Sequence, residues 1–273
     1  MGKNRVRNTY ENYCKRLREA RGTGDGLSYI GWLTGHEFAS RGAFVRMMGY
    51  TVPRMYTFFS HLESDIFRIY DHMDGVTDIK EQFPLPLSET LSISDRLCIK
   101  HPYSDPSYNV ITTDLLILKD GEWMGRAVKR SCDLDNPRIV EKLRIEQEWY
   151  RERGVDWKIV TEKQINRELI QNIRWLYEDG DDVTRLIQDS DLLDQCERVF
   201  LDLYQEKNMP FADILEIVEE AFSLDHGVGM AIFKKLVRTR QVSFDMEAQF
   251  NPVDPRVPLE QRGVRYGRYA SYS

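Results

Sequence analysis

The strongest constraint in this sequence is a tight turn between two runs of strand-forming residues, at Asp120-Gly121. Asp-Gly is a typical central pair of a two-residue β-hairpin turn, because both central residues need a left-handed backbone that glycine adopts freely. The flanking runs, SYNVITTDLLILK over 107–119 and EWMGRAVKR over 122–130, are rich in aliphatic and β-branched residues. The sequence therefore predicts an antiparallel hairpin whose register is set by its turn.

This register brings together groups that could carry chemistry. With the turn at its centre, Asp114 faces Ala127, and Lys129 lies one diagonal step away on the same face. The Asp114 carboxylate suits a hard cation, the Lys129 ammonium can orient or deprotonate a water, and the carbonyl of Val128 is a further oxygen ligand. A carboxylate, about a dozen further residues and then a short strand that ends in lysine form the minimal pattern of the PD-(D/E)xK nuclease core. A plain cross-strand salt bridge fits the same pattern, so both interpretations stay open here.

A second acidic residue, Glu63, is open to two interpretations as well. The segment Ser60-His61-Leu62-Glu63 fits a capping box, in which Glu63 returns a hydrogen bond to the Ser60 amide. The predicted helix that begins here, SHLESDIFRIYDHM, leads into the predicted strand VTDIKEQFPLPL, so it can lie against the sheet that holds Asp114. Glu63 is then either a helix cap or, with Asp114 and Lys129, part of a divalent-metal phosphodiesterase site.

The chain changes character near residue 163, and at about 100–200 residues per domain its length of 273 residues predicts two domains. Residues 1–163 are predicted to be a catalytic domain, a mixed α/β sheet flanked by helices. The elements expected there are a basic helix over 8–21, a glycine loop over 21–26, short strands around Pro53, a helix from 60, a strand over 76–87, a long loop to about 107, the hairpin, a helix over 137–154 and a strand over 157–161.

Residues 164–250 are predicted to be a mostly helical, winged-helix-like domain, with helices over 165–179, 191–207, 210–224 and 228–240 and a strand over 242–250. Its last helix carries Lys234, Lys235 and Arg238, which contact phosphate if that helix reads DNA. The acidic character of the rest of this domain favours docking to a protein. Residues 251–273, rich in Pro, Arg and Tyr, predict a flexible tail.

The net charge of −6 hides an asymmetry, because residues 1–60 hold 10 Lys and Arg against 4 Asp and Glu. The basic residues Lys15, Arg16, Arg18 and Arg21 are predicted either to contact phosphate or to form a solvated helix face. No run approaches the roughly 18 apolar residues that a bilayer span needs. The four widely spaced cysteines fit reduced thiols better than a disulfide framework or a zinc site. We expect a cytoplasmic, bacterial protein without a membrane partner.

Glu63, Asp114 and Lys129 lie within a series of sequence blocks: LESDIF, VTDIKEQFPL, IKHP, TTDLLILKDG, AVK, EKLRIEQEWY and INRELIQNIRWLY. In order and spacing the blocks resemble the TnsA endonuclease family of heteromeric cut-and-paste transposons. The resemblance extends upstream to ARGTGDGLSYIGWLT and covers roughly residues 18–178. Several linked blocks in one order are far more specific than any one of them.

The resemblance implies a restriction-endonuclease-like domain that cuts the 5′ ends of a mobile element, joined to a winged-helix-like domain that docks a regulator. Family active-site positions fall on Glu63, Asp114 and Lys129, with Mg²⁺ as the metal and Mn²⁺ as its substitute. Glu146 stands at a further acidic family position, with a solvated helix face as the alternative interpretation. The implied partners are transposon-end DNA, a TnsB-like DDE transposase and a TnsC-like AAA+ ATPase regulator.

The sequence departs from the family at one position, since the residue two before the lysine is Ala127, where Gln or Glu is expected. An alanine side chain cannot hold a metal, so a second ligand must come from Glu63, from the Val128 carbonyl or from water. Two other functions stay open: a non-catalytic adaptor that keeps the nuclease fold and bridges transposase and regulator, and a stand-alone restriction or repair nuclease.

Overall fold

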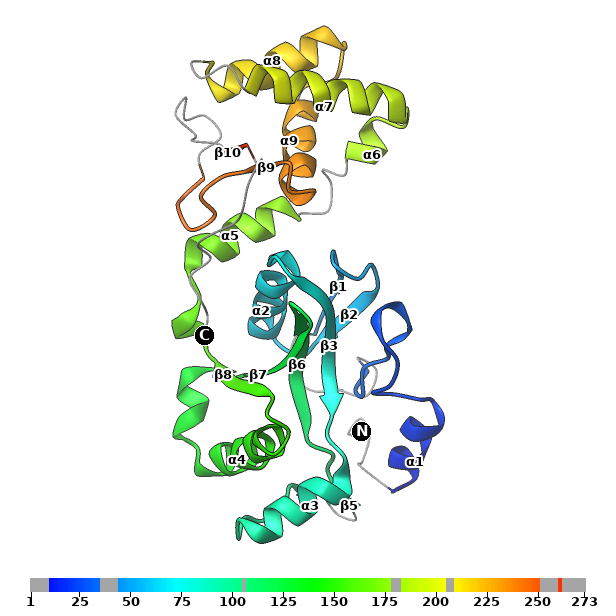
Figure 1. The fold of residues 1–273 in the computed structure, drawn as a ribbon, viewed down its shortest axis with the longest axis vertical. Helices are drawn as coiled ribbons and strands as arrows, with labels where there is room; N and C mark the ends of the chain where they lie inside the picture. The colour runs from blue at the N-terminus through cyan, green and yellow to red at the C-terminus, as the bar shows by residue number, and fades with distance from the viewer. Residues whose placement is uncertain are drawn as a thin grey trace, which may run out of the picture. The chain divides into compact units, whose positions relative to one another are not determined.

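The computed structural model describes residues 10–34, 44–104, 107–177, 183–204, 209–250 and 260–261. The chain divides into two compact units, Met1–Ile165 and Asn166–Ser273. The first is a mixed α/β unit and the second is mostly helical, which confirms the predicted fold class (Figure 1). No helix within these described ranges is long and apolar enough to cross a membrane.

The elements of the first unit are α1 (Tyr10–Arg18), η1 (Gly26–Ser28), β1 (Val45–Met48), β2 (Met55–Phe58), α2 (His61–His72), β3 (Val76–Pro84), α3 (Leu87–Arg96), β4 (Tyr103–Ser104), β5 (Ser107–Tyr108), β6 (Thr112–Lys119), β7 (Glu122–Val128), η3 (Ser131–Asp135), α4 (Pro137–Arg151), β8 (Asp156–Val160) and η4 (Glu162–Gln164). Its main sheet has the strand order β3-β6-β7-β8 (Figure 1). β3, β6 and β7 are antiparallel neighbours, whereas β8 is parallel to β7. A parallel pair needs a crossover, and α4 supplies it.

The hairpin formed by β6 and β7 has the predicted register. Asp120 and Gly121 occupy the centre of its turn with φ of 51° and 84°, the left-handed backbone that such a turn requires. Leu115 pairs with Arg126 across the hairpin, which is the pairing that a turn at these two residues dictates. The hairpin prediction is therefore confirmed, and so is the position of Asp114 relative to the end of β7.

The helices α2 and α4 cover opposite faces of the sheet. In β7, Arg126 Nε donates to the hydroxyl of Tyr70 in α2 at 2.9 Å. The preceding residue, Gly125, faces α4, where a Cβ added to it would lie 2.9 Å from Cζ of Tyr150. Successive residues of a strand point to opposite faces, so the two helices enclose the sheet from both sides.

The long loop predicted to about residue 107 is wrong, because α3 and the short strands β4 and β5 lie there. β3 ends at Pro84, where the prolines were expected to stop it, but proline with its preset φ also opens a helix, and Pro86 takes the N-cap position of α3. Thr90, Ile93 and Ser94, at helical spacing, form the buried side of α3. The sequence analysis used the prolines only as strand breakers and so missed this helix.

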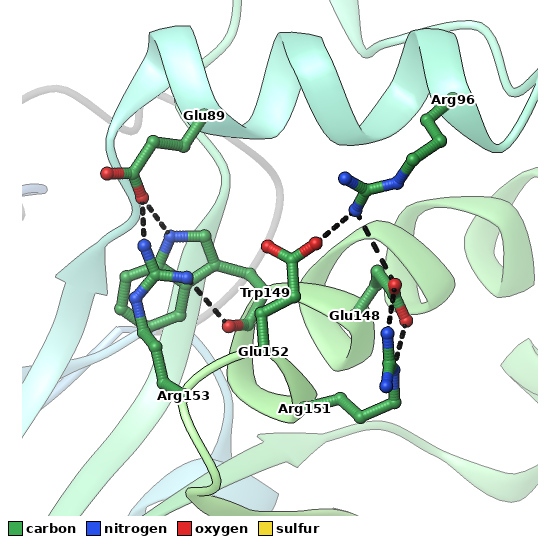
Figure 2. A network of polar contacts seen from close by, with 7 residues as sticks. All are labelled: Glu89, Arg96, Glu148, Trp149, Arg151, Glu152 and Arg153. Carbon is green, nitrogen blue, oxygen red and sulfur yellow. Dashed lines mark hydrogen bonds and ion pairs between the residues drawn. The ribbon is translucent and has the colours of Figure 1, made fainter.

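Charged and aromatic side chains join α3 to α4 (Figure 2). The indole Nε1 of Trp149 donates to Glu89 at 2.6 Å, and the guanidinium of Arg153 lies 3.8 Å from the Trp149 ring centroid while pairing with Glu89 at 2.5 Å. Arg96 pairs with Glu152 further along the two helices. Such partly exposed ion pairs contribute little individually, so the buried apolar side chains beneath them supply most of the stability.

The amino-terminal segment lies along β3, an edge strand of the main sheet. Gly22 has φ of 75°, and a Cβ added there would meet Cγ of Pro84 at 2.1 Å, so only glycine allows this close approach. The Trp32 amide donates to the carbonyl of Gln82 at 3.4 Å. The glycine loop therefore serves to cover a sheet edge that would otherwise be open to pairing with another chain.

The elements of the second unit are α5 (Arg167–Leu176), α6 (Val183–Leu186), α7 (Ser190–Tyr204), α8 (Phe211–Ala221), α9 (Val228–Arg238), β9 (Val242–Ser243) and β10 (Glu260–Gln261). Its core is aromatic: the ring of Phe233 in α9 lies 6.0 Å from that of Phe200 and 4.8 Å from that of Phe211. Aromatic pairs at such separations add to the area that they bury.

The strand predicted over 242–250 ends at Ser243, where β9 pairs with β10. Beyond it the Asp245 carboxylate accepts from the Glu247 amide at 2.9 Å and turns the chain. This local turn competes with the alternating pattern on which the strand prediction rested. The predicted flexible tail, 251–273, lies outside the described residues apart from 260–261, which form β10.

The close packing of Gly125 leads to a stability prediction. In Gly125→Ala the new Cβ would meet Cδ1 of Trp157 at 2.8 Å and Cζ of Tyr150 at 2.9 Å, and neither ring can yield without moving the sheet or α4. We expect a loss of about 1–3 kcal/mol in the free energy of unfolding, measured by urea denaturation. Arg151→Ala, on the exposed side of α4, is the control and should stay within about 0.5 kcal/mol of wild type. An unchanged midpoint for Gly125→Ala would contradict this packing.

Candidate active site

The end of the hairpin brings Asp114 and Lys129 into contact. Oδ2 of Asp114 accepts from the Val128 amide and from Nζ of Lys129, both at 2.7 Å. Nζ of Lys129 also donates to the carbonyl of Val128 at 2.7 Å. The sequence left a cross-strand ion pair and a nuclease pattern as alternatives. In the structure Asp114 and Lys129 do form an ion pair, and this contact is compatible with both interpretations. All of the Asp114 hydrogen bonds seen in the described part of the chain use Oδ2, which leaves Oδ1 available.

Glu63 lies at the first turn of α2 and is held by hydrogen bonds. Ser60 is the N-cap, and its side chain accepts from the Glu63 amide at 3.1 Å. The Glu63 carboxylate accepts from the Phe59 amide at 3.1 Å and from the Ser60 hydroxyl at 3.0 Å. The capping-box prediction is thus wrong in one detail, because the carboxylate bonds the amide of Phe59 and not that of Ser60. A carboxylate in this place is further stabilised by the helix dipole.

The surroundings of Glu63, Asp114 among them, change its ionisation. Burial, followed by repulsion from Asp114, raises the pKa of Glu63 to about 7. For Lys129 burial lowers the pKa, but the attraction of Asp114, together with the hydrogen bond to it, outweighs that effect and leaves the pKa above its usual value. Lys129 is therefore a cation at neutral pH, and both Asp114 and Glu63 attract its charge.

Glu146 approaches the same site from α4. The alternative interpretation of this residue as part of a solvated helix face is wrong, because Glu146 is only 1% exposed. Its carboxylate accepts from the indole Nε1 of Trp157 at 3.0 Å. Burial is the main cause that raises the pKa of Glu146, and both Asp114 and Lys129 also act on it electrostatically. A third acid thus lies within electrostatic reach of the Asp114–Lys129 pair.

An open cavity of about 460 Å³ adjoins this cluster. It is lined by Phe59, Ser60, His61, Leu62, Glu63, Val128, Lys129, Arg130 and Asp133. Arg130, whose side chain is 73% exposed, was not singled out from the sequence, where only its position next to Lys129 marks it. The lining contains two acids, Glu63 and Asp133, and two cations, Lys129 and Arg130, of which Arg130 lies 3.7 Å from Asp133. Acids and cations together are the charges that a metal-bound phosphodiester needs.

The basic residues near the amino terminus are divided by burial. Arg16 and Arg21 are 5% and 8% exposed, and both contact Trp32. Cζ of Arg16 lies 5.5 Å from the Trp32 ring centroid, and Arg21 donates to the Trp32 carbonyl at 3.4 Å. Their burial is contrary to the predicted contact with phosphate. Lys15 and Arg18 are exposed, so for them the predicted contact stays a prediction.

The basic residues of α9 do not form an exposed stripe either. Lys234 is 2% exposed, with Nζ 4.5 Å from the ring centroid of Trp175, so it is part of the core and cannot make the predicted contact. Lys235 pairs with Glu197 of α7, which leaves its side chain 25% exposed. Arg238 is half-buried at the end of the helix. The sequence showed three cations at neighbouring positions but not which side of the helix faces the core.

A mixed sheet with helices on both faces, and a hairpin lysine and aspartate beside a helix glutamate, is the architecture of a restriction-endonuclease-like protein. Residues 74–162 match the family described as TnsA-like endonuclease N terminal, and residues 164–246 match TnsA endonuclease C terminal. The chain is also 31% identical over 240 residues to the transposon Tn7 transposition protein TnsA of Escherichia coli, which covers 87% of this chain and 86% of that protein. The chain belongs to the TnsA endonuclease family, as the sequence resemblance predicted. Asp114, Lys129 and Glu146 lie within the first matched segment, and Glu63 precedes it.

The raised pKa of Glu63 predicts how stability depends on pH in the metal-free protein. Between the usual value of 4.5 and about 7 the folded protein holds a proton on Glu63 that the unfolded chain releases. The stabilisation of the folded state by this bound proton is fully present below about pH 4.5 and is lost as the pH rises through about 7. Glu63→Gln removes this loss, so at pH 8 in EDTA we expect it to be on the order of 1–3 kcal/mol more stable than wild type, with a smaller difference at pH 5.

Urea unfolding of both proteins at the two pH values measures this difference. Glu122→Gln, which changes an exposed acid at the turn end of β7, is the control and should follow the wild-type pH dependence. If the free energy of unfolding changed with pH in the same way for wild type and Glu63→Gln, the pKa of Glu63 would not be raised in the folded protein.

Proposed function

We propose that this chain is a Mg²⁺-dependent DNA endonuclease that cleaves the 5′ strands at transposon ends, as one subunit of a heteromeric transposase in the bacterial cytoplasm. Its family supports the coarser part of this statement, an endonuclease of transposition. The observation that carries the finer part is the contact of Asp114 with Lys129, beside Glu63 and an open cavity. These are the residue types that hydrolysis of a phosphodiester requires.

The oxygen donors of the site fit a hydrated divalent ion. Oδ1 of Asp114, the carboxylate of Glu63 and the carbonyl of Val128 are hard ligands of the kind that Mg²⁺ prefers. Among the described residues no three His, Cys, Asp or Glu side chains form a group that could enclose a metal. Mg²⁺ usually keeps several waters and needs few protein ligands, so an open site without a side-chain donor at Ala127 is compatible with it. Glu146, bonded to Trp157, would act from outside this ligand set.

A bound Mg²⁺ would supply Lewis-acid activation of the scissile phosphate and of a water. Lys129 has two conceivable roles, to deprotonate that water or to offset negative charge. Its raised pKa supports the second, because an ammonium held by Asp114 and the Val128 carbonyl keeps its proton at neutral pH. Arg130, at the rim of the same cavity, is placed to hold the DNA backbone.

We infer three partners: transposon-end DNA, a TnsB-like DDE transposase that handles the 3′ ends and a TnsC-like AAA+ ATPase regulator. The matched relative is by name a transposition protein, which supports work within such a complex. The burial of Lys234 and the pairing of Lys235 with Glu197 take cations away from a DNA-reading role. They support docking of the second unit to a protein rather than to a duplex.

A non-catalytic adaptor is the second candidate, and Ala127 is the observation that favours it. This residue is 1% exposed at the position where the family has a side chain able to bind a metal. Retention of Asp114 and Lys129 in direct contact weighs against an adaptor, since a lost site has no need of this pair.

Substitution of Asp114 tests the proposed function. Asp114 is only 9% exposed and bonds both Val128 and Lys129, so its side chain contributes to the stability of the fold. Asp114→Ala would therefore cost about 1–3 kcal/mol of stability, whereas Asp114→Asn keeps an acceptor for both donors. We expect Asp114→Asn to fold and to lose at least roughly 100-fold in cleavage of 5′-labelled transposon ends with the transposase and regulator present. Arg151→Ala serves as the control and should cleave like wild type.

The same assay separates the alternatives. Wild-type transposition by Asp114→Asn, together with no Mn²⁺ bound by the wild-type chain, would establish the adaptor. Cleavage of DNA without transposon ends by the purified chain alone would establish a stand-alone nuclease.

A further inference from the structure

One buried residue beside the active site has an unusual backbone. Glu81 pairs with Leu115 and Phe83 with Thr113, so Gln82 stands directly across the β3–β6 ladder from Asp114. Its φ is +50°, the left-handed region that residues with a side chain adopt rarely and that interrupts strand geometry. Such a conformation persists only where the surrounding structure imposes it, and it is common at functional sites.

The backbone of Gln82 is held from outside the sheet. Its carbonyl accepts from the Trp32 amide at 3.4 Å, a contact with the amino-terminal segment that covers β3. The flanking residues, Glu81 and Phe83, keep the same register on either side, so the left-handed residue turns one side chain without shifting the strand. The fold therefore redirects Gln82 and leaves Asp114 in place.

The redirected side chain of Gln82 bridges the two halves of the site. Its Oε1 accepts from the hydroxyl of Thr112 at 3.2 Å, and its Nε2 donates to Oε2 of Glu63 at 3.3 Å. Thr112 lies on β6 two residues before Asp114. An ionised carboxylate only accepts hydrogen bonds, so toward the charged form of Glu63 the Gln82 side chain presents its amide nitrogen, and it turns its oxygen to Thr112. At 3% exposure this amide is shielded from water and has a fixed orientation.

We propose that Gln82 is a positioning residue that holds the Glu63 carboxylate in place relative to Asp114, an inference that rests on the proposed function. In this chain the strand position at Ala127 offers no carboxylate, so the second acid comes from a separate element, α2. Phe59 and Ser60 position Glu63 only relative to its own helix end. Among the residues that the structure describes, Gln82 is the donor that joins Glu63 to the sheet.

The sequence contains only a weak trace of this role. Gln82 ends a run of polar residues in VTDIKEQF, and Asp78, Lys80, Glu81 and Gln82 are all buried there. Polar residues in succession on a buried strand each need a partner, but the partners of these four lie on separate segments: the glycine loop, the segment after Pro53, α2 and β6.

Three variants and one control test the proposal, with Mn²⁺ alone as the probe in isothermal titration calorimetry. Gln82→Met keeps the length of the side chain and cannot donate to Glu63. Gln82→Asn suits a left-handed backbone and keeps an amide, but is too short to bridge Thr112 and Glu63. We expect both to bind Mn²⁺ 10- to 100-fold more weakly than wild type, the range typical of residues that orient metal ligands. Cleavage of transposon ends with the partner proteins present should also be weaker for both variants than for wild type.

Thr112→Val removes the other end of the bridge with little change of shape, so it tests the proposal without replacing Gln82. Its loss of Mn²⁺ affinity should be near the lower end of the same range. Thr113→Val, on the same strand as Thr112, is the matched control. It removes the buried hydrogen bond that the Tyr150 hydroxyl of α4 donates to Thr113 at 2.9 Å, and it does not touch Gln82 or Glu63. It should lower the melting temperature in EDTA and leave Mn²⁺ affinity unchanged.

The outcomes distinguish this inference from the proposed function. If wild type binds no Mn²⁺, or if Asp114→Asn binds it as wild type does, the metal site itself is overturned, and this inference with it. If Asp114→Asn loses Mn²⁺ while the two Gln82 variants and Thr112→Val all bind within twofold of wild type, only the positioning role of Gln82 is overturned. A loss shared equally by Thr113→Val would likewise show a general effect of stability.

Discussion

The hydrogen bond between Oδ2 of Asp114 and Nζ of Lys129 is the contact on which the rest of the site depends. It exists because a two-residue turn sets the register of the hairpin, and the register places a carboxylate and an ammonium at the same end of it. A shift by one residue would turn every side chain of the strand to the opposite face and separate the pair. The geometry of a turn thus decides whether the proposed catalytic centre can form.

The site concentrates charge in a place where charge is costly. Glu63, Asp114 and Glu146 are each at most 9% exposed, and all three act electrostatically on the cation Lys129. Burial raises the pKa of Glu63 and of Glu146, and the burial of like charges opposes folding unless a counterion is present. A divalent cation would relieve that repulsion. The same arrangement that disfavours the metal-free state would therefore favour metal binding.

Hydrogen bonds from neighbouring elements compensate for this charge and limit how far the site can relax. Phe59 and Ser60 hold Glu63 at the start of α2, Trp157 holds Glu146 on α4, and Gln82 reaches Glu63 from the edge strand. The glycine loop takes part as well, because its segment binds the carbonyl of Gln82 through Trp32. A segment outside the proposed active site thus contributes to the geometry of the acids.

Local physical rules determine the hairpin, the helix that begins at Ser60, the mixed order of strands and helices and the pairing of Asp114 with Lys129, because turn chemistry and side-chain alternation act over short distances. The tertiary structure alone decided the burial of Glu146, Arg16 and Lys234, each of which faces the core from a helix whose sequence fits a solvated face as well. It also decided the place of Gln82, whose backbone and side chain are held by Trp32, Thr112 and Glu63 from three distant segments. Burial depends on which elements pack together, and no local pattern contains that information.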